Sequence, residues 1–362
     1  MEKSTFVGCV LFMNRYYMLL VSFCLLLASC DTLPDSDIVT DLPSYYDDYL
    51  DKRVDAINET IKECDGNSEC FFWITDIHWE QDLNSRRSPA MIKYIADRTG
   101  VKRILNGGDT GNAQVICQNA IDRLRDAIGS NEVYSVNGNH EMTDASKYEK
   151  PFRRVDEELR GHCSNLVYGD DDRSYFYFDD STQKTRYIGL SVFGLYRNGG
   201  SEPTLTAEQL AWFKNTALNV EDGWKIIVFA HSMLYVSDTS DKLSTVYSEA
   251  ADFVKAIDTY NGKGKIICVL LGHTHRDRMH KEPNGVPYII SASDRYSPYY
   301  TNGVADINVD RVPGTITEQH FEVVVIDRKN KKVRLFAIGG QARDGYDDEP
   351  GNCVDERVVT YE

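Results

Sequence analysis

Apolar residues recur along this chain in two patterns, one with helical spacing and one of short unbroken runs. Between residues 44 and 64 the apolar positions fall on one helical face, at Leu50, Val54, Ile57 and Ile61. This spacing predicts an amphipathic helix that begins at Ser44 and packs against a core. The stretch 70–75 is almost wholly apolar, which is typical of a buried strand, and it ends directly on Asp76.

The same two patterns alternate through the rest of the first half. Helices are predicted over 87–98 and 113–128, and buried strands over 101–105 and 133–136. An order of strand, helix, strand, helix, strand indicates a central sheet whose strands are joined by crossover helices.

The second half contains more predicted strands than helices. Four strands are expected, at 174–179, 185–193, 226–229 and 266–271. A helix is predicted to begin near Thr206, where Thr206 and Gln209 form a capping-box pattern. Two further runs, 320–326 and 332–337, flank a charged turn and predict a hairpin.

The arrangement of these elements favours one catalytic domain over 44–362. The interior contains no Pro/Ser-rich linker, no repeat and no low-complexity tract. Residues 142–172 are polar and weakly periodic, so an insertion is expected within 142–185.

The first thirty residues have the pattern of an export signal. An apolar run, Met18 to Ala28, follows Arg15 and is too short for a membrane span, which needs about 20 residues. The ending Leu-Ala-Ser-Cys resembles a bacterial lipobox. It implies a lipoprotein signal peptide over 1–29, a tether over 30–43, and a lipid on Cys30 that contacts the membrane of a bacterial cell envelope, in the periplasm or at the surface. An ordinary secretory signal with a chance cysteine is the alternative.

Charge and cysteine content limit the partners and the covalent chemistry. The net charge of −16 argues against duplex nucleic acid as a partner, since that binding needs clustered Lys and Arg. Six cysteines follow Cys30, an even number that permits disulfides in an exported protein, with Cys64–Cys70 the most local candidate. Cys268 lies in an apolar run and is expected to be a buried free thiol.

Five clusters of metal-ligating residues each follow a predicted strand. They are Asp76-Ile77-His78, Gly107-Gly108-Asp109, Gly138-Asn139-His140-Glu141, the single His231, and Gly272-His273-Thr274-His275. Ligand sites in open α/β sheets gather at the carboxyl ends of the strands. Carboxylate, imidazole and amide ligands together suit two divalent cations held side by side with a water between them.

The spacing within the clusters supports the prediction of two cations held side by side. In extended backbone, residues two apart point the same way, so Asp76 and His78 can reach one cation, and His273 and His275 can converge similarly. Asp109 has two carboxylate oxygens and can bridge both cations. The glycines before the ligands are expected to allow tight turns and close backbone approach.

Each cluster alone also has an ordinary structural interpretation, as a turn, a cap or a buried histidine. Their joint order after apolar runs favours a dinuclear centre. The histidines outside the clusters, His162, His280 and His320, are expected to be structural or on the surface.

The series resembles the calcineurin-like metallophosphoesterase superfamily, whose pattern is Asp-x-His, Gly-Asp, Gly-Asn-His-Asp/Glu, His and Gly-His-x-His. The match spans Asp76 to His275. The resemblance implies a four-layer α/β/β/α sandwich with two mixed β-sheets. It also implies one metal bound by Asp76, His78, Asp109 and His275, and a second bound by Asp109, Asn139, His231 and His273. His140 would protonate the leaving alkoxide or contact the phosphate.

The implied activity is hydrolysis of small phosphate mono- or diesters by a bridging hydroxide. The ligand types fit manganese, iron or zinc and do not choose among them. Asn112 stands where purple acid phosphatases have a tyrosine ligand, which argues against a tyrosinate–iron centre. No Gly-x-Ser-x-Gly, P-loop or His-Glu-x-x-His motif occurs. The alternative is a surface-anchored, non-catalytic binding module with the same fold.

Substrate recognition is left with open alternatives. Tyr296, Tyr299 and Tyr300, with Arg295 nearby, either stack on a base, sugar or lipid headgroup or pack on neighbouring loops. Arg276 and Arg278 either hold a phosphate or solvate a loop.

Overall fold

The structure is a computed structural model that describes most of the chain after residue 40. The described residues are 41–79, 84–111, 114–141, 163, 165–170, 174–193, 205–236, 243–246, 250–281, 283–295, 311–312, 314–346 and 351–361. The predicted signal peptide, tether residues 30–40, Asn112, His162, the three loop tyrosines and residues 142–162 of the predicted insertion lie outside them. Among the described residues, no helix is long and apolar enough to cross a membrane.

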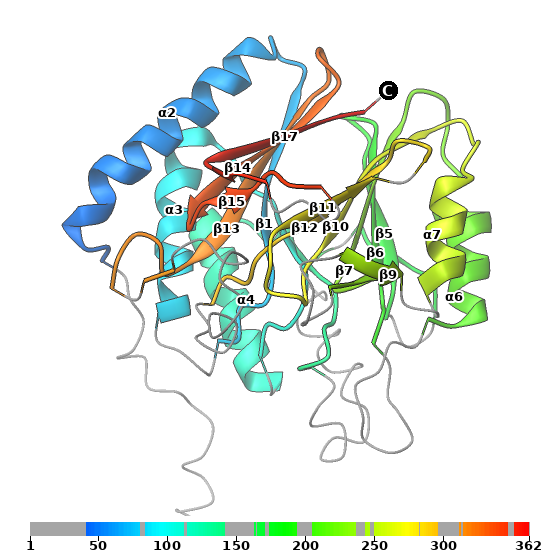
Figure 1. Ribbon diagram of the computed structural model, residues 1–362, viewed down its shortest axis with the longest axis horizontal. Helices are drawn as coiled ribbons and strands as arrows, with labels where there is room; N and C mark the ends of the chain where they lie inside the picture. The colour runs from blue at the N-terminus through cyan, green and yellow to red at the C-terminus, as the bar shows by residue number, and fades with distance from the viewer. Residues whose placement is uncertain are drawn as a thin grey trace, which may run out of the picture. The chain divides into compact units, whose positions relative to one another are not determined.

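Two large mixed β-sheets form the centre of the fold (Figure 1). Sheet A has the order β17 (Glu356–Thr360), β14 (Lys332–Gly339), β13 (His320–Asp327), β1 (Ser68–Ile74), β2 (Ile104–Asn106) and β3 (Val133–Ser135). Sheet B has the order β11 (Arg278–Lys281), β12 (Pro287–Ile290), β10 (Lys265–Leu271), β7 (Lys225–Ala230), β6 (Thr185–Leu190), β5 (Phe176–Asp180) and β4 (Val167–Tyr168).

Each sheet combines parallel and antiparallel pairs. In sheet A, β1, β2 and β3 are parallel, whereas β13 pairs antiparallel with β1. In sheet B, β6, β7, β10 and β12 are parallel to their neighbours in this central part, and β5 and β11 run antiparallel at its sides. The carboxyl ends of the central strands of both sheets therefore carry the loops that hold the candidate ligands.

Helices cover the outer face of each sheet and give four layers. The helices α2 (Asp47–Glu63), α3 (Ser88–Thr99) and α4 (Gln114–Ile128) pack on sheet A, and α6 (Ala207–Trp212) and α7 (Ala251–Asp258) pack on sheet B. A third hydrophobic cluster, which includes Trp73 of sheet A and Phe229 of sheet B, fills the space between the sheets. The expected α/β/β/α sandwich with two mixed sheets is confirmed.

The helical and hairpin patterns read from the sequence correspond to observed elements. Leu50, Val54 and Ile57 are buried on one face of α2, which follows a short 3-10 turn, η2 (Ser44–Tyr46). A second turn, η3 (Asn84–Arg87), precedes α3. The hairpin of β13 and β14 closes with Asp327 opposite Lys332. These elements could be predicted because each has a long apolar face.

Several short elements were not predicted from the sequence. Outside the two sheets lie β8 (Leu234–Val236) with β9 (Leu243–Val246), and β15 (Ala342–Arg343) with β16 (Cys353–Val354). The strands β11, β12 and β17 and the helix α7 were also not individually predicted. Strands of two to five residues are too short to show a clear periodicity, and neighbouring strands determine them.

The predicted capping box at α6 is half present. Thr206 caps the helix by accepting a hydrogen bond from Gln209 N at 3.1 Å. The Gln209 side chain does not return to Thr206. It donates to Ser191 O at 2.8 Å and accepts from Ser191 N at 2.9 Å, so it fastens α6 to the end of β6.

The described cysteines are free thiols. Cys64 and Cys70 are therefore not the disulfide that their spacing suggested. They are neighbours, since burial and then Cys64 raise the pKa of Cys70, which lies on β1. Cys268 is a fully buried free thiol on β10, as expected.

Candidate metal centre

The five ligand clusters converge where five strands end between the two sheets. Asp76 follows β1, Asp109 follows β2, and Asn139 follows β3 from sheet A. His231 follows β7, and His273 follows β10 from sheet B. The structure brings together the Asp and His side chains that follow β1, β2, β7 and β10.

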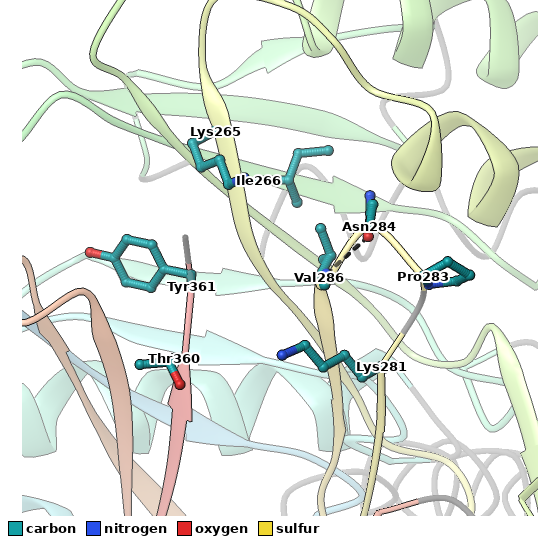
Figure 2. Close-up of a pocket in the computed structure, with 9 residues that line it drawn as sticks. Lys265, Ile266, Lys281, Pro283, Asn284, Val286, Thr360 and Tyr361 are labelled. Atoms are coloured by element: carbon teal, nitrogen blue, oxygen red, sulfur yellow. Dashed lines mark hydrogen bonds between the residues drawn. The ribbon is translucent and has the colours of Figure 1, made fainter.

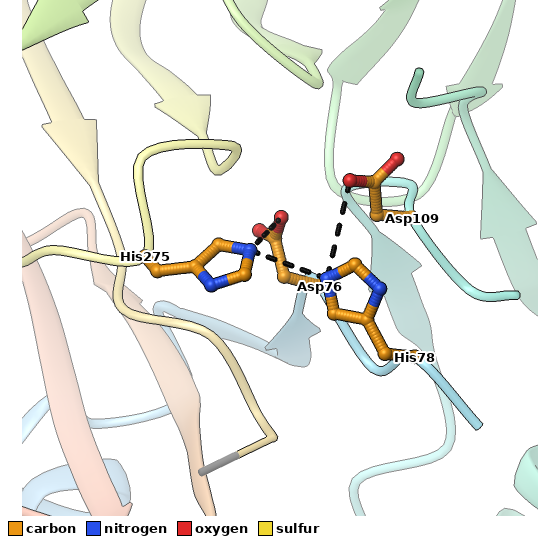
Figure 3. Close-up of side chains that lie close together, drawn as sticks. All are labelled: Asp76, His78, Asp109 and His275. Atoms are coloured by element: carbon orange, nitrogen blue, oxygen red, sulfur yellow. Dashed lines mark hydrogen bonds and ion pairs between the residues drawn. The ribbon is translucent and has the colours of Figure 1, made fainter. Parts of the chain in front are cut away.

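Four of the predicted ligands form a first cluster, drawn in Figure 3: Asp76, His78, Asp109 and His275. His275 Nε2 lies 3.1 Å from Asp76 Oδ1 and 3.2 Å from His78 Nε2. His78 Nε2 lies 4.0 Å from Asp109 Oδ2. One donor atom from each of the four residues lies within 4.8 Å of the other three, a spacing that one cation can span.

A second cluster shares Asp109 with the first and adds His231 and His273. His231 Nε2 lies 3.3 Å from Asp109 Oδ2. The other nitrogen, His231 Nδ1, lies 2.7 Å from Gly107 O and must donate a proton to that carbonyl. In the neutral ring this leaves the Nε2 lone pair directed at the cluster, which is the usual arrangement of a metal-ligating histidine.

Asn139 stands in the chain between Gly138 and His140, whose backbones lie against Glu141 and Asp109. Its Oδ1 is buried and accepts no hydrogen bond from the part of the chain that the structure describes. A buried amide oxygen without a donor is costly in a folded protein. A cation would satisfy this oxygen without adding negative charge to the site.

His140 lies at the mouth of the site rather than within the clusters. Its side chain is 30% exposed, whereas that of Asp109 is 2% exposed. Its ring packs edge-on against His78, with centroids 4.6 Å apart, and its Nε2 is 3.9 Å from Asp109 Oδ2. The backbone His140 N donates to Asp109 Oδ1 at 2.8 Å, so the ring is held over the buried ligands.

The backbone of five of the seven candidate ligand residues is left-handed, not extended. The φ angles are 54° at Asp76, 46° at His78, 51° at Asp109, 69° at His273 and 56° at His275. The expectation that extended backbone directs the paired side chains was therefore wrong, although the side chains do converge. Non-glycine residues pay about 1–2 kcal/mol each for this conformation, which local contacts must offset. At Asp76, the carboxylate Oδ2 accepts from His273 N at 2.9 Å and from Thr75 Oγ1 at 2.7 Å.

Two of the glycines have roles in this arrangement. Gly108 has a φ of 94° and makes the turn into Asp109. Gly138 allows close approach, because a Cβ there would lie 2.1 Å from Asp109 Oδ1. Gly108 also allows close approach, because a Cβ there would lie 2.6 Å from Gly138 N, so it has both expected roles.

Burial and the two carboxylates determine the charges of the metal-free site. Burial opposes a charge on His231, but the Asp109 and Asp76 carboxylates outweigh it and raise its pKa to about 10. Burial lowers the pKa of His78 to about 3 and that of His273 to about 4. Both rings are therefore neutral, and each has a nitrogen lone pair that can bind a metal ion. The pKa of Asp109 is held well below its usual range, because the neighbouring imidazoles, His231 foremost, outweigh the effect of burial. A cation binding here competes with the proton on His231.

Glu141 has a role that the sequence did not reveal. Its carboxylate accepts backbone hydrogen bonds from Asp109 N at 3.0 Å, Thr110 N at 2.5 Å and Gly138 N at 2.7 Å. It thereby ties the loop that carries Asp109 to the loop that carries Asn139. Burial and the Asp109 charge raise the pKa of Glu141 to about 7. An acid after Asn-His is visible in the sequence, but its backbone partners are not.

The arginines near the last motif are buried. Arg278 on β11 is fully buried and donates to Asp277 O at 3.2 Å, and Arg276 is also buried, so neither merely solvates a loop. Arg295 begins the segment that leads to the tyrosines, and its N–H lies beside the centre, donating to Asp76 O at 3.4 Å.

Two of the histidines outside the motifs are structural. His280 on β11 is half-buried and packs against the Tyr288 ring. His320 is buried and has acidic neighbours, Asp277 and Glu322, that the sequence did not show. Both carboxylate oxygens of Glu322 accept hydrogen bonds, Oε1 from Arg357 and Oε2 from Ser291, so this group is an internal ion-pair network rather than a cation site.

A family model described as calcineurin-like phosphoesterase matches residues 71–277. That range covers more than half of the chain and contains every candidate ligand. The chain belongs to the calcineurin-like phosphoesterase family. It is a metal-dependent phosphoesterase, and its two clusters, joined by Asp109, fit two metal ions.

Several solved structures are similar to this chain. A dimetal phosphatase from Danio rerio is 12% identical, with a TM-score of 0.49 over 81% of this chain and 99% of that chain. A phosphopantetheinyl hydrolase from Mycobacterium tuberculosis is 14% identical, with a TM-score of 0.38 over 65% of this chain and 92% of that chain. A 5'-nucleotidase from Candida albicans is 18% identical, with a TM-score of 0.38 over 62% of this chain and 46% of that chain. A comparison with curated proteins found no match.

Proposed function

We propose that this phosphoesterase hydrolyses small phosphate mono- or diesters at a dinuclear centre with a defined division of ligands. One ion is held by Asp76, His78, Asp109 and His275, and the other by Asp109, Asn139, His231 and His273. The observation that carries this assignment is the position of Asp109. It is the one carboxylate that both clusters share, and its Oδ2 faces imidazoles from both sheets.

When bound, two divalent cations supply an activated water and neutralise charge on the phosphoryl oxygens. The residues of this chain provide the rest. The carboxylates of Asp76 and Asp109 limit the net positive charge, while Asn139 contributes a neutral oxygen. The Gly107 carbonyl fixes the orientation of the His231 ring, so that Nε2 faces the centre.

His140 is proposed as the residue that meets the substrate. It is more exposed than Asp76, His78 and Asp109, and its backbone bond to Asp109 fixes its place above them. From there Nε2 can donate a hydrogen bond to a phosphoryl oxygen or a proton to the leaving alkoxide. This role requires that the His140 ring is not itself a metal ligand.

The proposed setting is outside the cytoplasm, with the domain anchored through a lipid on Cys30. The motivation is the Leu-Ala-Ser-Cys ending of the apolar amino-terminal run. The net charge of −16 supports a small phosphoester rather than duplex nucleic acid as substrate. Arg295 and the tyrosines that follow it are proposed to contact the group beyond the phosphate, since Arg295 N lies against Asp76 O.

Elemental analysis of the purified protein, with paired rates on p-nitrophenyl phosphate and its bis ester, tests this proposal. We expect about two metal ions per chain, measurable turnover, and loss of both in Asp109→Ala. The relative rates on the two esters decide between monoester and diester preference. A manganese- or zinc-loaded protein that is inert towards a broad panel of phosphoesters would refute catalysis and favour the binding-module alternative.

A further inference from the structure

Three lysines lie in sheet B on the side away from the metal-binding loops. Lys225 begins β7, Lys265 begins β10, and Lys281 ends β11. The strand β10 runs from Lys265 to Leu271 before it reaches the ligand loop. At about 3.3 Å per residue, Lys265 is roughly 20 Å from that loop. This region is separate from the metal centre.

Like charges are placed side by side here, and no carboxylate of the described residues pairs with them. Lys225 and Lys265 are direct partners in the register of β7 and β10, an arrangement that is destabilising for two cations. Neither they nor Lys281 form an ion pair or side-chain hydrogen bond with any residue in the described part of the chain. Burial and then the cations Arg328, Lys331 and Lys265 lower the pKa of Lys225, which agrees with this crowding. These three lysines form a locally positive region in a chain whose net charge is −16.

A cavity of about 380 Å³ adjoins two of these lysines (Figure 2). We call it the lysine pocket; its walls include Lys265, Lys281, Asn284, Val286, Thr360 and Tyr361. The walls come from β10 and β11 of sheet B, from the turn between β11 and β12, and from the end of β17 in sheet A. A volume of this size lies in the range of small-molecule sites, about 300–1,000 Å³.

One wall of the lysine pocket is fixed by its own hydrogen bonds. Asn284 Nδ2 donates to Ile257 O at 2.9 Å, and Asn284 Oδ1 accepts from Val286 N at 2.9 Å, the dashed line in Figure 2. The nearby carboxylate of Asp258 is engaged by Asn284 N at 3.1 Å. Asp222 raises the pKa of Lys225, but its effect is smaller than that of each of the three neighbouring cations, which lower it. The described chain thus offers these ammonium groups no partner of its own.

We propose that the lysine pocket binds a phosphate group, either as free phosphate or as part of a small organic phosphate, between Lys265 and Lys281. Lysine ammonium groups are compact, strongly hydrated charges that bind phosphate as point charges. The Thr360 hydroxyl is a further donor at the wall. The pocket has room for an organic group beyond the phosphate. This site is distinct from the metal centre and does not depend on the proposed catalytic function.

Acetylation footprinting of the full-length, metal-loaded protein tests the site. The protein is treated with sulfosuccinimidyl acetate in inorganic phosphate, in glycerol phosphate, or in sodium chloride of equal ionic strength, and each lysine is followed by mass spectrometry. Phosphate at ten times its dissociation constant leaves about a tenth of the sites empty, so Lys265 and Lys281 should react about tenfold more slowly. Lys93 and Lys263, which pair with Asp97 and Glu221, are internal controls that should not change.

This readout separates the two sites, because the candidate metal ligands include no lysine. Phosphate bound at the metal centre alone leaves the reactivity of Lys265 and Lys281 unchanged. Protection by glycerol phosphate but not by inorganic phosphate indicates an organic phosphate as ligand. Equal protection by sodium chloride overturns the proposal, because it shows only general screening of charge.

Variants make the test specific. Lys265→Gln should abolish the phosphate protection of Lys281, and Lys281→Gln that of Lys265, whereas the matched surface variant Lys263→Gln should preserve both. Glu282, between Lys281 and Pro283, and Glu362, after Tyr361, lie outside the described residues. If the two lysines react slowly without added anion and become reactive in Glu282→Gln or in Glu362→Gln, a carboxylate of the chain neutralises the pocket and the proposal is wrong.

Discussion

Two of the places where the described chain buries charged side chains are the metal centre and the surroundings of Glu69 at the start of β1. The Glu69 carboxylate is surrounded by donors: Arg103 at 3.1 Å, Arg328 at 2.6 Å, the Thr185 hydroxyl at 2.6 Å and the Tyr187 hydroxyl. At the metal centre two carboxylates face several imidazoles, and the Asn139 oxygen has no donor among the described residues.

The difference shows which buried charges serve the fold and which serve the reaction. Around Glu69 the chain supplies its own cations, so the network is complete without any ligand. At the metal centre the described chain provides only the proton on His231 as a positive charge, and the Asn139 oxygen has no donor, so the acids, imidazoles and amide oxygen together are suited to cations. A folded protein retains such an incomplete site at a functional position and compensates for it elsewhere. Changes at the two places should therefore have opposite signatures.

The largest effect is expected from Asp109→Asn. The substitution preserves shape but removes the charge that both clusters share, so both metal ions should be lost and turnover should fall to background. The protein should still fold, because the complete networks elsewhere are untouched. Elemental analysis, initial rates and far-ultraviolet circular dichroism measure these three properties. Retention of both ions in Asp109→Asn would show that Asp109 is not the bridging ligand.

His140→Ala should separate catalysis from metal binding. The ring lies outside both clusters, so both ions should remain, while the rate should fall by about 10²–10⁴, the usual range for a general acid. The paired measurement is metal content against kcat on p-nitrophenyl phosphate. If His140→Ala keeps the full rate, the residue plays no part in the reaction; if it loses metal, the residue is a ligand instead.

Glu69→Gln should show the opposite signature. Removing this charge breaks the buried pair with Arg328 and leaves Arg103 only Glu132 and Asp180 as carboxylate partners. Breaking a buried ion pair typically costs about 3–5 kcal/mol of unfolding free energy. Metal content should not change. Glu132→Gln is the matched control, since Glu132 also pairs with Arg103 but is 45% exposed, and exposed pairs contribute about 0–1 kcal/mol. Urea denaturation of the two variants measures the difference, and equal losses would contradict the distinction between the two acids.

The positions of the metal ligands were predictable from sequence because they follow apolar strands in a fixed order. The ends of β1, β2, β3, β7 and β10 meet for topological reasons that an alternating pattern of strands and helices already contains. The fold was predictable for the same reason, together with the resemblance of the motifs to a known family.

What could not be predicted depends on contacts between distant parts of the chain. The left-handed backbone of Asp76 is stabilised by His273 N, which comes from the other sheet. Gln209 was expected to cap its own helix, but Ser191 takes both of its hydrogen bonds. Glu141 was visible in its motif, whereas its three backbone partners come from loops that only the folded chain brings together. Local patterns carry no information about such partners.

Metal binding should depend on pH through His231. Its pKa is raised from 6.5 to about 10 by Asp109 and Asp76, which outweigh burial, so in the metal-free protein the ring is protonated at pH 8. Each ion that binds at this ring must displace one proton, and apparent affinity should rise about tenfold per pH unit between pH 7 and 9. Calorimetry in buffers of different ionisation enthalpy should detect about one proton released per chain at pH 8.

The same group gives the pH dependence of stability. Because the folded-state pKa is raised, the stabilising pair of His231 with the carboxylates is complete below about pH 6.5 and is lost as the pH rises through 10. The metal-free protein should therefore lose stability over this range. The metal-loaded protein should not lose it, since a cation replaces the proton. A metal-free protein whose unfolding temperature is constant from pH 6.5 to 10 would exclude a protonated His231.

Glu141→Gln should have the smallest effect. It should lower both protein stability, as at Glu69, and metal binding, as at the metal centre. Three backbone N–H groups point at this carboxylate, and an amide NH₂ in its place must face at least one of them. One buried donor left without an acceptor costs about 1–3 kcal/mol. The donors belong to the loops that carry Asp109 and Asn139, so part of this cost should appear as weaker metal binding, by about tenfold for each 1.4 kcal/mol. Glu69→Gln should lower stability alone, whereas Glu141→Gln should lower stability and metal affinity together. If titration with manganese shows the same affinity in Glu141→Gln and in the unaltered protein, Glu141 supports the fold only, and the acid that ties the loops belongs with Glu69.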